Sequence, residues 1–318
     1  MKKLLVVVGP TGAGKTRLSI SLAKQFNGEL VSADSRQVYR QMDIGTGKEV
    51  EELQKGKAFR DKGHWVVEGV KIHLYDILDP DQTFSVAQFQ QKAYDMIHTL
   101  QNQDKLPILV GGTGLYVSAV VDGLKVPKAP PDLKLRSELQ DMSLEDLQNM
   151  LLKYDPGSAK KIDTANPRRI IRALEVFAQT GRSFVSLQEK FHPDFDILRI
   201  GLSSPRELLY DRVDRQVEKW FELGFVEEVK KLLEQGYQKD LPSMTSIGYR
   251  QIVALTQGVL SESEAKQRIK FDRHSYIRRQ LSWFKRDGRI RWFDITRSDY
   301  PENLVSEVSA WYTLNDEI

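Results

Sequence analysis

The sequence predicts an α/β protein in which helices flank a parallel sheet and an all-helical insertion interrupts the chain. Short apolar segments bounded by glycines alternate with helical patterns up to residue 124, and the strand pattern resumes at Asp196. Between these stretches only helical patterns occur, after a junction that contains Pro127, Pro130 and Pro131. We therefore expect a discontinuous core, 1–124 with 196–318, and a helical insertion domain, 125–195.

The composition limits the classes of function that the chain can have. Of the 318 residues, 40% are hydrophobic and 29% charged, which is typical of a soluble globular protein. No apolar run approaches the roughly 20 residues of a membrane span, and the first residues do not resemble a signal peptide, so we expect a cytoplasmic protein. The absence of cysteine excludes disulfides, Cys-ligated zinc and thiol catalysis, and the five histidines form no metal-binding pair.

The first structural element is a strand, Leu4–Val8, that leads directly into a phosphate-binding loop. The loop matches the pattern G-x-x-x-x-G-K-T and is followed by a helical pattern, so the core is expected to be P-loop NTPase-like. Backbone amides wrap the phosphates in such a loop, the lysine adds a positive charge and the threonine hydroxyl can hold Mg²⁺. The predicted polyphosphate site consists of Gly9, Pro10, Thr11, Gly12, Ala13, Gly14, Lys15 and Thr16.

Two further strands end in polar residues that could reach the same crevice. The segment Glu29–Ser32 is expected to lie beside the first strand, which would bring Asp34 to the edge of the loop. Asp34 could equally be a helix cap, and the pattern does not decide between the two roles. A buried strand at Pro107–Val110 ends in Gly111-Gly112-Thr113, where an ordinary tight turn is the alternative to a crevice-side hydroxyl. The upstream loop favours the functional role for Thr113.

Other segments are assigned by local signals. Residues 40–70 are rich in charges and glycines and are expected to be mainly loop. Ser85 with Gln88, and Ser204 with Glu207, have the spacing of capping boxes that open helices.

Two helical segments carry an excess of positive charge. One begins at Asn166-Pro167, ends at Gly181, and carries Arg168, Arg169 and Arg172. The other extends from Lys266 to Arg291, where ten Lys or Arg stand against two Asp, and it has an apolar stripe on one face. A solvated basic face without a partner is the alternative, but the phosphate-binding loop favours contact with phosphate or nucleic acid.

The residues alone leave two classes of enzyme open. No apolar strand ends in the metal-binding Asp that an ATPase needs, which weakens the case for ATP hydrolysis although the loop resembles an ATP-binding motif. A kinase of a small metabolite and a phosphoryl or pyrophosphoryl enzyme acting on nucleic acid both fit.

The sequence resembles the tRNA dimethylallyltransferases, also called tRNA isopentenyltransferases, over nearly its whole length. Six motifs in the same order carry the resemblance: Gly9–Thr16; Ser32–Ser35 with Tyr39-Arg40 and Met42–Thr46; Gly111–Tyr116; Asn166–Arg169 with Arg172–Glu175; Ile247–Gln251; and Arg278–Leu281 with Trp283-Phe284. Eukaryotic relatives often have a C-terminal zinc finger. This chain has no cysteine and ends at Ile318, so the resemblance implies the shorter bacterial type without that finger.

The resemblance implies a prenyl transfer. The dimethylallyl group of dimethylallyl diphosphate would move to the N6 amine of the adenosine 3′ to the anticodon (position 37 of tRNA), and diphosphate would leave. The loop would then bind the donor's diphosphate, with Mg²⁺ at Thr16, while Asp34 would accept the proton of the amine and Thr113 would lie near both substrates. A monomer is sufficient for this reaction.

The resemblance also implies a set of tRNA contacts. Residues near the adenosine would be Asp34, Ser35, Arg36, Gln37 and Thr113, and those further away Arg136, Arg168, Arg169, Ile170, Ile171, Arg172 and Arg250. The chain departs from the family pattern at Arg36 and Ile171, so contacts there can differ. An adenylate isopentenyltransferase and a non-catalytic RNA-binding protein are the alternatives. The basic surfaces argue against the first, and the presence of both Asp34 and Thr113 argues against the second.

Overall fold

The computed structural model describes residues 2–61, 63–125, 127, 129–187 and 191–313. The chain forms two compact units, Met1–Val117 with Asp194–Ile318, and Ser118–Pro193. The sequence placed the boundaries at 124/125 and 195/196, whereas the first boundary between the units falls inside helix α4 (Gly114–Val121). Within the described residues, no helix is both long and apolar enough to cross a membrane.

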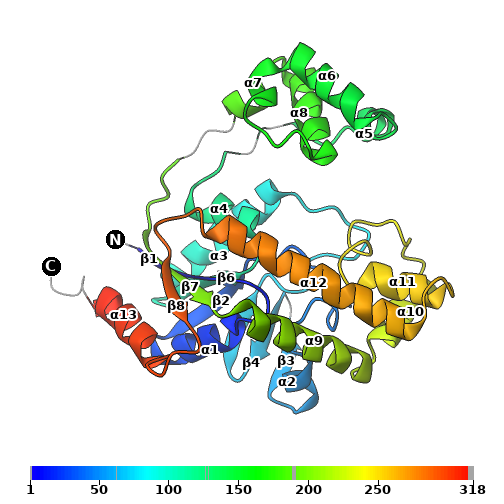
Figure 1. Cartoon of the computed structure of the whole chain (residues 1–318). Coiled ribbons are helices and arrows are strands. Elements are labelled where there is room, and N and C mark those ends of the chain that lie inside the picture. Colours follow the sequence, from blue (N-terminus) through cyan, green and yellow to red (C-terminus); the bar gives the residue numbers. More distant parts are fainter. Residues whose placement is uncertain (1, 62, 126, 128, 188–190, 314–318) are drawn as a thin grey trace. The chain divides into compact units, whose positions relative to one another are not determined.

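The first unit, hereafter the α/β unit, is built on one sheet of eight strands (Figure 1). Its order is β3-β4-β5-β2-β6-β1-β7-β8, and neighbouring strands from β5 through β8 are parallel. The predicted α/β class with helices flanking a largely parallel sheet is confirmed. The strands are β1 (Lys3–Val8), β2 (Gly28–Ser32), β3 (Ala58–Asp61), β4 (His64–Val67), β5 (Val70–His73), β6 (Leu106–Gly111), β7 (Asp196–Ser203) and β8 (Arg291–Asp294).

The expectation that the second strand lies beside the first is wrong. Strand β6 lies between them and pairs with both, so that Ile108 is opposite both Leu5 on β1 and Leu30 on β2. All six residues of β6 are buried, which requires neighbours on both sides and explains its central place. The three strands still run parallel, so their C-terminal ends share one edge.

The expectation that residues 40–70 are mainly loop holds for only about half of the stretch. This stretch contains helix α2 (Val50–Gln54) and strands β3 and β4, and β4 pairs antiparallel with both β3 and β5. Each strand has four residues, and β3 is exposed after its first residue, so the alternation of apolar and polar residues is too short to detect. Trp65 and Val67 provide the buried face.

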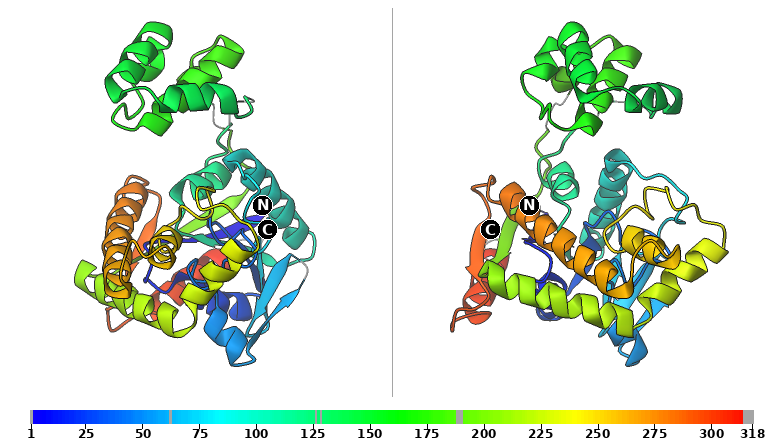
Figure 2. Two further views of the ribbon diagram at one scale, coloured as in Figure 1. Left: turned by 90° about the vertical axis from the view of Figure 1, so that its right-hand side faces the viewer. Right: turned by 45° about the vertical axis from the view of Figure 1, so that its right-hand side comes forward.

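Helices cover the sheet, and two long ones, α9 (Arg206–Glu222) and α12 (Glu262–Phe284), lie side by side (Figure 2). The α/β unit contains α1 (Lys15–Gln25), α3 (Val86–Gln101), α9 (Arg206–Glu222), α10 (Phe225–Glu234), α11 (Tyr249–Thr256), α12 (Glu262–Phe284) and α13 (Glu302–Thr313). The capping box at Ser85 is confirmed. The one at Ser204 is wrong, because Pro205 is the N-cap residue of α9 and no side chain caps it.

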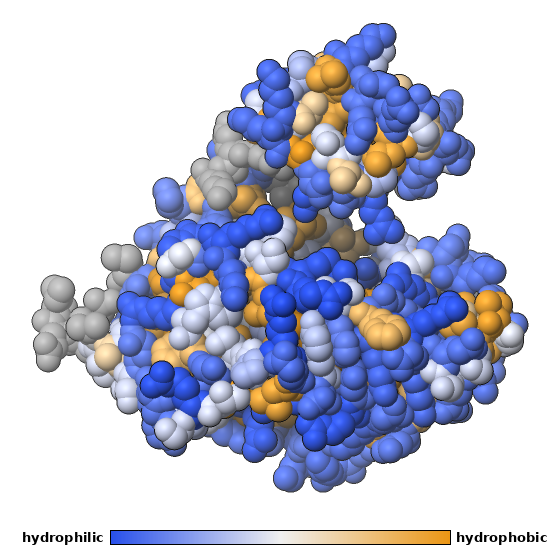
Figure 3. All heavy atoms as spheres, viewed as in Figure 1, coloured by the Kyte–Doolittle hydropathy of each residue, from blue (hydrophilic) through white to orange (hydrophobic). Residues whose placement is uncertain are grey.

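The second unit, hereafter the helical unit, consists of short helices around a small core. After α4 come α5 (Leu133–Gln140), α6 (Leu144–Tyr154), α7 (Pro156–Ala159), α8 (Pro167–Thr180) and a 3₁₀ turn at Phe184–Leu187. Ser143 caps α6, and Gly181 ends α8 in a left-handed conformation. Leu147, Leu151 and Ile170 are buried between these helices. The face of the protein shown in Figure 3 is mainly hydrophilic.

Candidate active site

Three loops leave the sheet at the same edge, after β1, β2 and β6. Val8 is opposite Gly111, and Ser32 is opposite Val110, so the three strands end side by side. Backbone hydrogen bonds join the two later loops, because Ala33 N–H donates to Val110 O at 2.7 Å and Thr113 N–H donates to Ala33 O at 3.3 Å. The edge therefore holds the phosphate-binding loop, Asp34 and Thr113 together.

The phosphate-binding loop has the backbone that its glycines predict. Gly9 has φ of 141°, and a Cβ there would lie 2.7 Å from the carbonyl oxygen of Leu202, so only glycine fits. Helix α1 begins at Lys15, and its N-terminus faces the loop. Lys15 Nζ donates to Pro10 O at 2.8 Å. Burial lowers the pKa of Lys15 to about 8, and the negative charge of Asp34 opposes that shift.

The two oxygens of Asp34 have different surroundings. Oδ1 accepts the backbone N–H groups of Arg36 at 2.8 Å and Gln37 at 3.4 Å, which is the capping role that the sequence left open. Among the described residues, none donates a hydrogen bond to Oδ2. The side chain is only partly buried. Asp34 is thus held by one oxygen, and the other is free to meet a ligand.

Thr113 lies next to this carboxylate, and an unexpected tyrosine lies beside both. The Thr113 hydroxyl oxygen accepts Ser35 N–H at 3.2 Å, so its own hydrogen can be donated elsewhere. The hydroxyl of Tyr276, on α12, is 3.5 Å from Gly112 O and hydrogen-bonds Thr113. Burial, together with the charge of Asp34, raises the pKa of Tyr276 to about 12, so this tyrosine stays protonated.

Helix α12 contacts the loops directly, which the sequence analysis did not predict. Gln280 Oε1 accepts Thr11 N–H at 2.9 Å, and its Nε2 donates to Gly112 O at 2.9 Å. A Cβ at position 112 would lie 2.2 Å from that nitrogen, so a larger residue there would displace the amide of Gln280. One sequence feature could have indicated this contact. Gln280 is a polar residue beside the apolar Leu281 and Ile277, and a buried polar side chain needs a hydrogen-bond partner.

One carboxylate, that of Glu49, lies beside the hydroxyl of Thr16, to which the sequence analysis assigned Mg²⁺. Glu49, the N-cap residue of α2, accepts hydrogen bonds from the hydroxyls of Thr16 and Tyr75, the latter at 3.2 Å. Burial raises the pKa of Glu49 to about 7. No cluster of three or more His, Cys, Asp or Glu side chains that could hold a metal occurs in the described part of the chain. One hydroxyl and one carboxylate fit an ion that keeps several waters and binds substrate phosphates.

The predicted tRNA contacts fall into several groups. In the α/β unit, Arg36 donates to Pro242 O at 2.7 Å and Arg250 pairs with Asp272 at 2.5 Å. The hydroxyl of Ser32 donates a hydrogen bond to Gln37 Oε1 at 2.9 Å.

In the helical unit, Arg136 and Arg172 both bind the buried carboxylate of Glu175. Arg168 is exposed, and Arg169 is half exposed with Asp163 3.4 Å away. Ile170 and Ile171 are buried in the core of this unit, so their side chains serve packing and do not form an outer surface.

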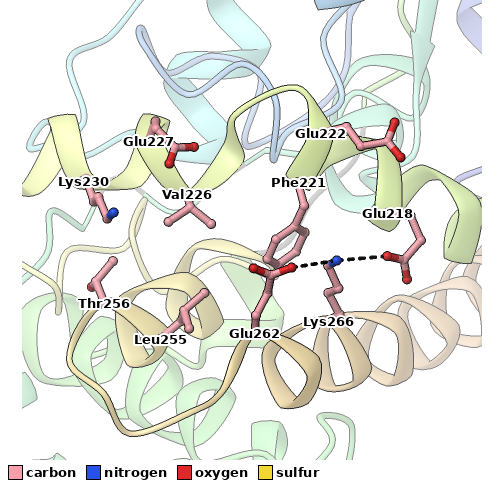
Figure 4. A pocket seen from close by; sticks show the side chains of 10 residues that line it. All are labelled: Glu218, Phe221, Glu222, Val226, Glu227, Lys230, Leu255, Thr256, Glu262 and Lys266. Atoms are coloured by element: carbon pink, nitrogen blue, oxygen red, sulfur yellow. Dashed lines mark ion pairs between the residues drawn. The ribbon is translucent and has the colours of Figure 1, made fainter.

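A groove of about 680 Å³ lies away from this edge, between α9, α10, α11 and α12 (Figure 4). None of the predicted site residues lines it. Lys266 bridges Glu262 at 2.8 Å and Glu218 at 3.2 Å, and Lys270 also pairs with Glu218 at 2.6 Å. Arg289 pairs with Asp287 and Arg291 with Glu307, so at least four of the ten basic residues counted between 266 and 291 have acidic partners within the protein. These ion pairs reduce the positive charge that this segment presents.

Comparisons with known proteins match this architecture. A family model for IPP transferases matches residues 37–287, and one for isopentenyl transferases matches residues 2–70. A tRNA dimethylallyltransferase of Thermomicrobium roseum is 44% identical over 311 residues, covering 96% of this chain and 91% of the relative. One from Alkaliphilus oremlandii is 40% identical over 310 residues, covering 96% of this chain and 95% of the relative.

Two solved structures are similar over nearly the whole chain. The tRNA isopentenylpyrophosphate transferase of Bacillus halodurans has a TM-score of 0.71 at 37% identity, covering 98% of this chain and 97% of that one. A eukaryotic dimethylallyltransferase described as acting on tRNA has a TM-score of 0.78 at 27% identity, covering 98% of this chain and 78% of that one. From the matched family model and the relatives that share 40–44% of its residues, this chain belongs to the IPP transferase family of tRNA dimethylallyltransferases.

Proposed function

We propose that this protein transfers the dimethylallyl group of dimethylallyl diphosphate to the N6 amine of the adenosine 3′ to the anticodon (position 37) in tRNA, releasing diphosphate. Family membership supports the reaction. The observation that carries the proposal is the meeting of the phosphate-binding loop, Asp34 and Thr113 at one edge of the sheet. An anion site, a base and a hydroxyl within one site are what this transfer requires.

The phosphate-binding loop binds the diphosphate of the donor. As the C–O bond breaks, its electron pair goes to the diphosphate oxygen, and negative charge grows there. The loop amides, the N-terminus of α1 and the ammonium of Lys15 stabilise that charge. Thr16, with Glu49 beside it, would hold Mg²⁺, which supplies further positive charge to the leaving diphosphate.

Asp34 acts as the base for the adenosine. The amine attacks the carbon that bore the diphosphate, forms the new C–N bond and must lose a proton. Oδ2 of Asp34 accepts that proton, because Oδ1 is already occupied by two backbone N–H groups. The hydroxyl of Thr113 orients the adenine. The adenosine must leave its stack to reach this site, which costs a few kcal/mol.

Contact with tRNA involves both units. We assign the insertion domain, 125–195, to the anticodon stem-loop backbone, with the exposed Arg168 and Arg169 as the phosphate contacts. Nothing in this function requires more than one copy of the chain.

A single transfer assay tests this function. The purified protein is incubated with labelled dimethylallyl diphosphate, Mg²⁺ and either unmodified tRNA or AMP. We expect label in tRNA, at the adenosine 3′ to the anticodon, together with free diphosphate. Label on AMP alone would show an adenylate isopentenyltransferase. No transfer to either acceptor would indicate a non-catalytic RNA-binding protein.

A further inference from the structure

Within the described part of the chain, a buried arginine on α12 has no carboxylate partner. Arg273 is 4% exposed and lies on the same face of the helix as the buried residues Ile269 and Ile277. The sequence thus places a cation in the apolar stripe, where a charge costs free energy unless it is paired. Among the described residues, no Asp or Glu oxygen lies within 4.0 Å of its guanidinium, and the nearby Asp214 binds His274 at 2.8 Å.

The contacts of Arg273 are neutral and incomplete. One terminal nitrogen, Nη2, donates to Gln216 Oε1 at 2.5 Å and lies 3.4 Å from Thr11 Oγ1. The other, Nη1, is buried and has no hydrogen-bond partner among the residues that the structure describes. The guanidinium carbon lies 4.1 Å from the ring centre of Trp220. Burial lowers the pKa of Arg273 to about 9, so the group remains a cation at neutral pH.

The position of this cation points to its ligand. Thr11 is the third residue of the phosphate-binding loop, and α12 contacts it twice. Gln280 binds the amide of Thr11, and Arg273, seven residues earlier on the same face, lies against its hydroxyl. An arginine with a free donor beside a phosphate-binding loop is suited to bind an oxygen of the anion that the loop holds.

We propose that Arg273 is a diphosphate-binding residue of this protein, and that its Nη1 donates to an oxygen of the diphosphate held by the loop. The inference rests on the proposed function for one point, namely that this diphosphate belongs to the prenyl donor. The buried cation then gains an anionic partner, which the described residues of the protein do not provide. Its attraction to the diphosphate grows as the C–O bond breaks, so it favours departure of the leaving group.

Binding of inorganic diphosphate tests this inference directly. Titration calorimetry with Mg²⁺ would compare the unaltered protein with Arg273→Gln and Arg273→Met. We expect both variants to bind diphosphate about 10- to 100-fold more weakly, because hydrogen bonds to charged groups are the strong ones. The matched control is Arg278→Gln on the same helix, which removes one charge from an exposed arginine that contacts Ser275 and Tyr210 and should leave diphosphate affinity unchanged.

Thermal unfolding without ligand separates binding from a structural role. Because Arg273→Met removes a buried charge without a counter-ion, its melting temperature should equal or exceed that of the unaltered protein. Unchanged diphosphate affinity in Arg273→Gln overturns the inference, whatever its melting temperature. If diphosphate binding depends on Arg273 but no prenyl group reaches tRNA, the proposed function fails and the inference about Arg273 stands.

Discussion

Glu175 in the helical unit and Arg273 in the α/β unit are both buried charged residues, and their surroundings are opposite. In the helical unit, the carboxylate of Glu175 is fully buried and accepts hydrogen bonds from Asp132 N–H at 2.7 Å and Arg136 at 2.7 and 2.9 Å. Arg172 adds a further bond, and these partners hold the pKa of Glu175 below its usual value despite burial. In the α/β unit, Arg273 has a free donor and Asp34 a free acceptor.

This difference separates charges that hold the fold from charges that await a ligand. Glu175 joins α8 to α5 and to the backbone before it, so its bonds are made within the protein. Asp34 and Arg273 keep unfilled hydrogen-bonding capacity at the sheet edge where the loops meet. Removing Glu175 should therefore cost stability, and removing either of the others should cost binding or catalysis.

The largest expected effect is on catalysis, at Asp34. The variant Asp34→Asn keeps an oxygen that can accept the N–H of Arg36, and loses only the base. Turnover of dimethylallyl diphosphate with tRNA should fall by about 10²- to 10⁴-fold, the usual contribution of a positioned base. The melting temperature and the tRNA affinity should stay close to those of the unaltered protein. A normal turnover number would remove Asp34 from the role of base.

Glu175 is the opposite case. The variant Glu175→Ala leaves Arg136 and Arg172 without their buried partner and should destabilise the helical unit by about 3–5 kcal/mol. Urea unfolding followed by limited proteolysis would measure the loss and show which unit opens first. Glu138→Ala, which removes an exposed carboxylate from α5, is the matched control and should change stability by less than about 0.5 kcal/mol. Equal stability of the two variants would contradict the structural role.

Much of the site could be predicted from the sequence because its signals are local. The phosphate-binding loop is one continuous motif, and Asp34 and Thr113 each follow a buried strand within a few residues. Parallel strands bring such ends to one edge even though the predicted neighbour of β1 was wrong. The fold class could be predicted for the same reason, since strand and helix patterns alternate over the length of the core.

The sequence predicted a phosphate contact for the segment that forms α12, but not which of its residues reach the site, because those contacts join residues far apart in the chain. Arg273 and Gln280 reach Thr11 across more than 250 residues, and within the sequence they look like members of a basic helix. A count of charges also could not show that Lys266 pairs with Glu218 and Glu262. A count of charges thus predicts a basic surface, but the burial and the ion pairs of each residue determine which positive charges that surface presents.

The smallest expected effect concerns the arginines of α8, which differ in exposure within the helical unit. Arg168 and Arg169 are on the surface, whereas Arg172, one turn later, binds Glu175. The double variant Arg168→Gln/Arg169→Gln should bind tRNA up to about 30-fold more weakly, since each exposed ion pair contributes at most about 1 kcal/mol. Its dependence on log salt should be flatter by about one unit per lost phosphate contact. Arg172→Gln should instead lower the unfolding free energy, because Glu175 loses a partner. Filter binding over a range of salt concentrations, with urea unfolding of each variant, measures both effects. If the double variant keeps the affinity and the salt slope of the unaltered protein, the surface arginines of α8 do not contact tRNA phosphates.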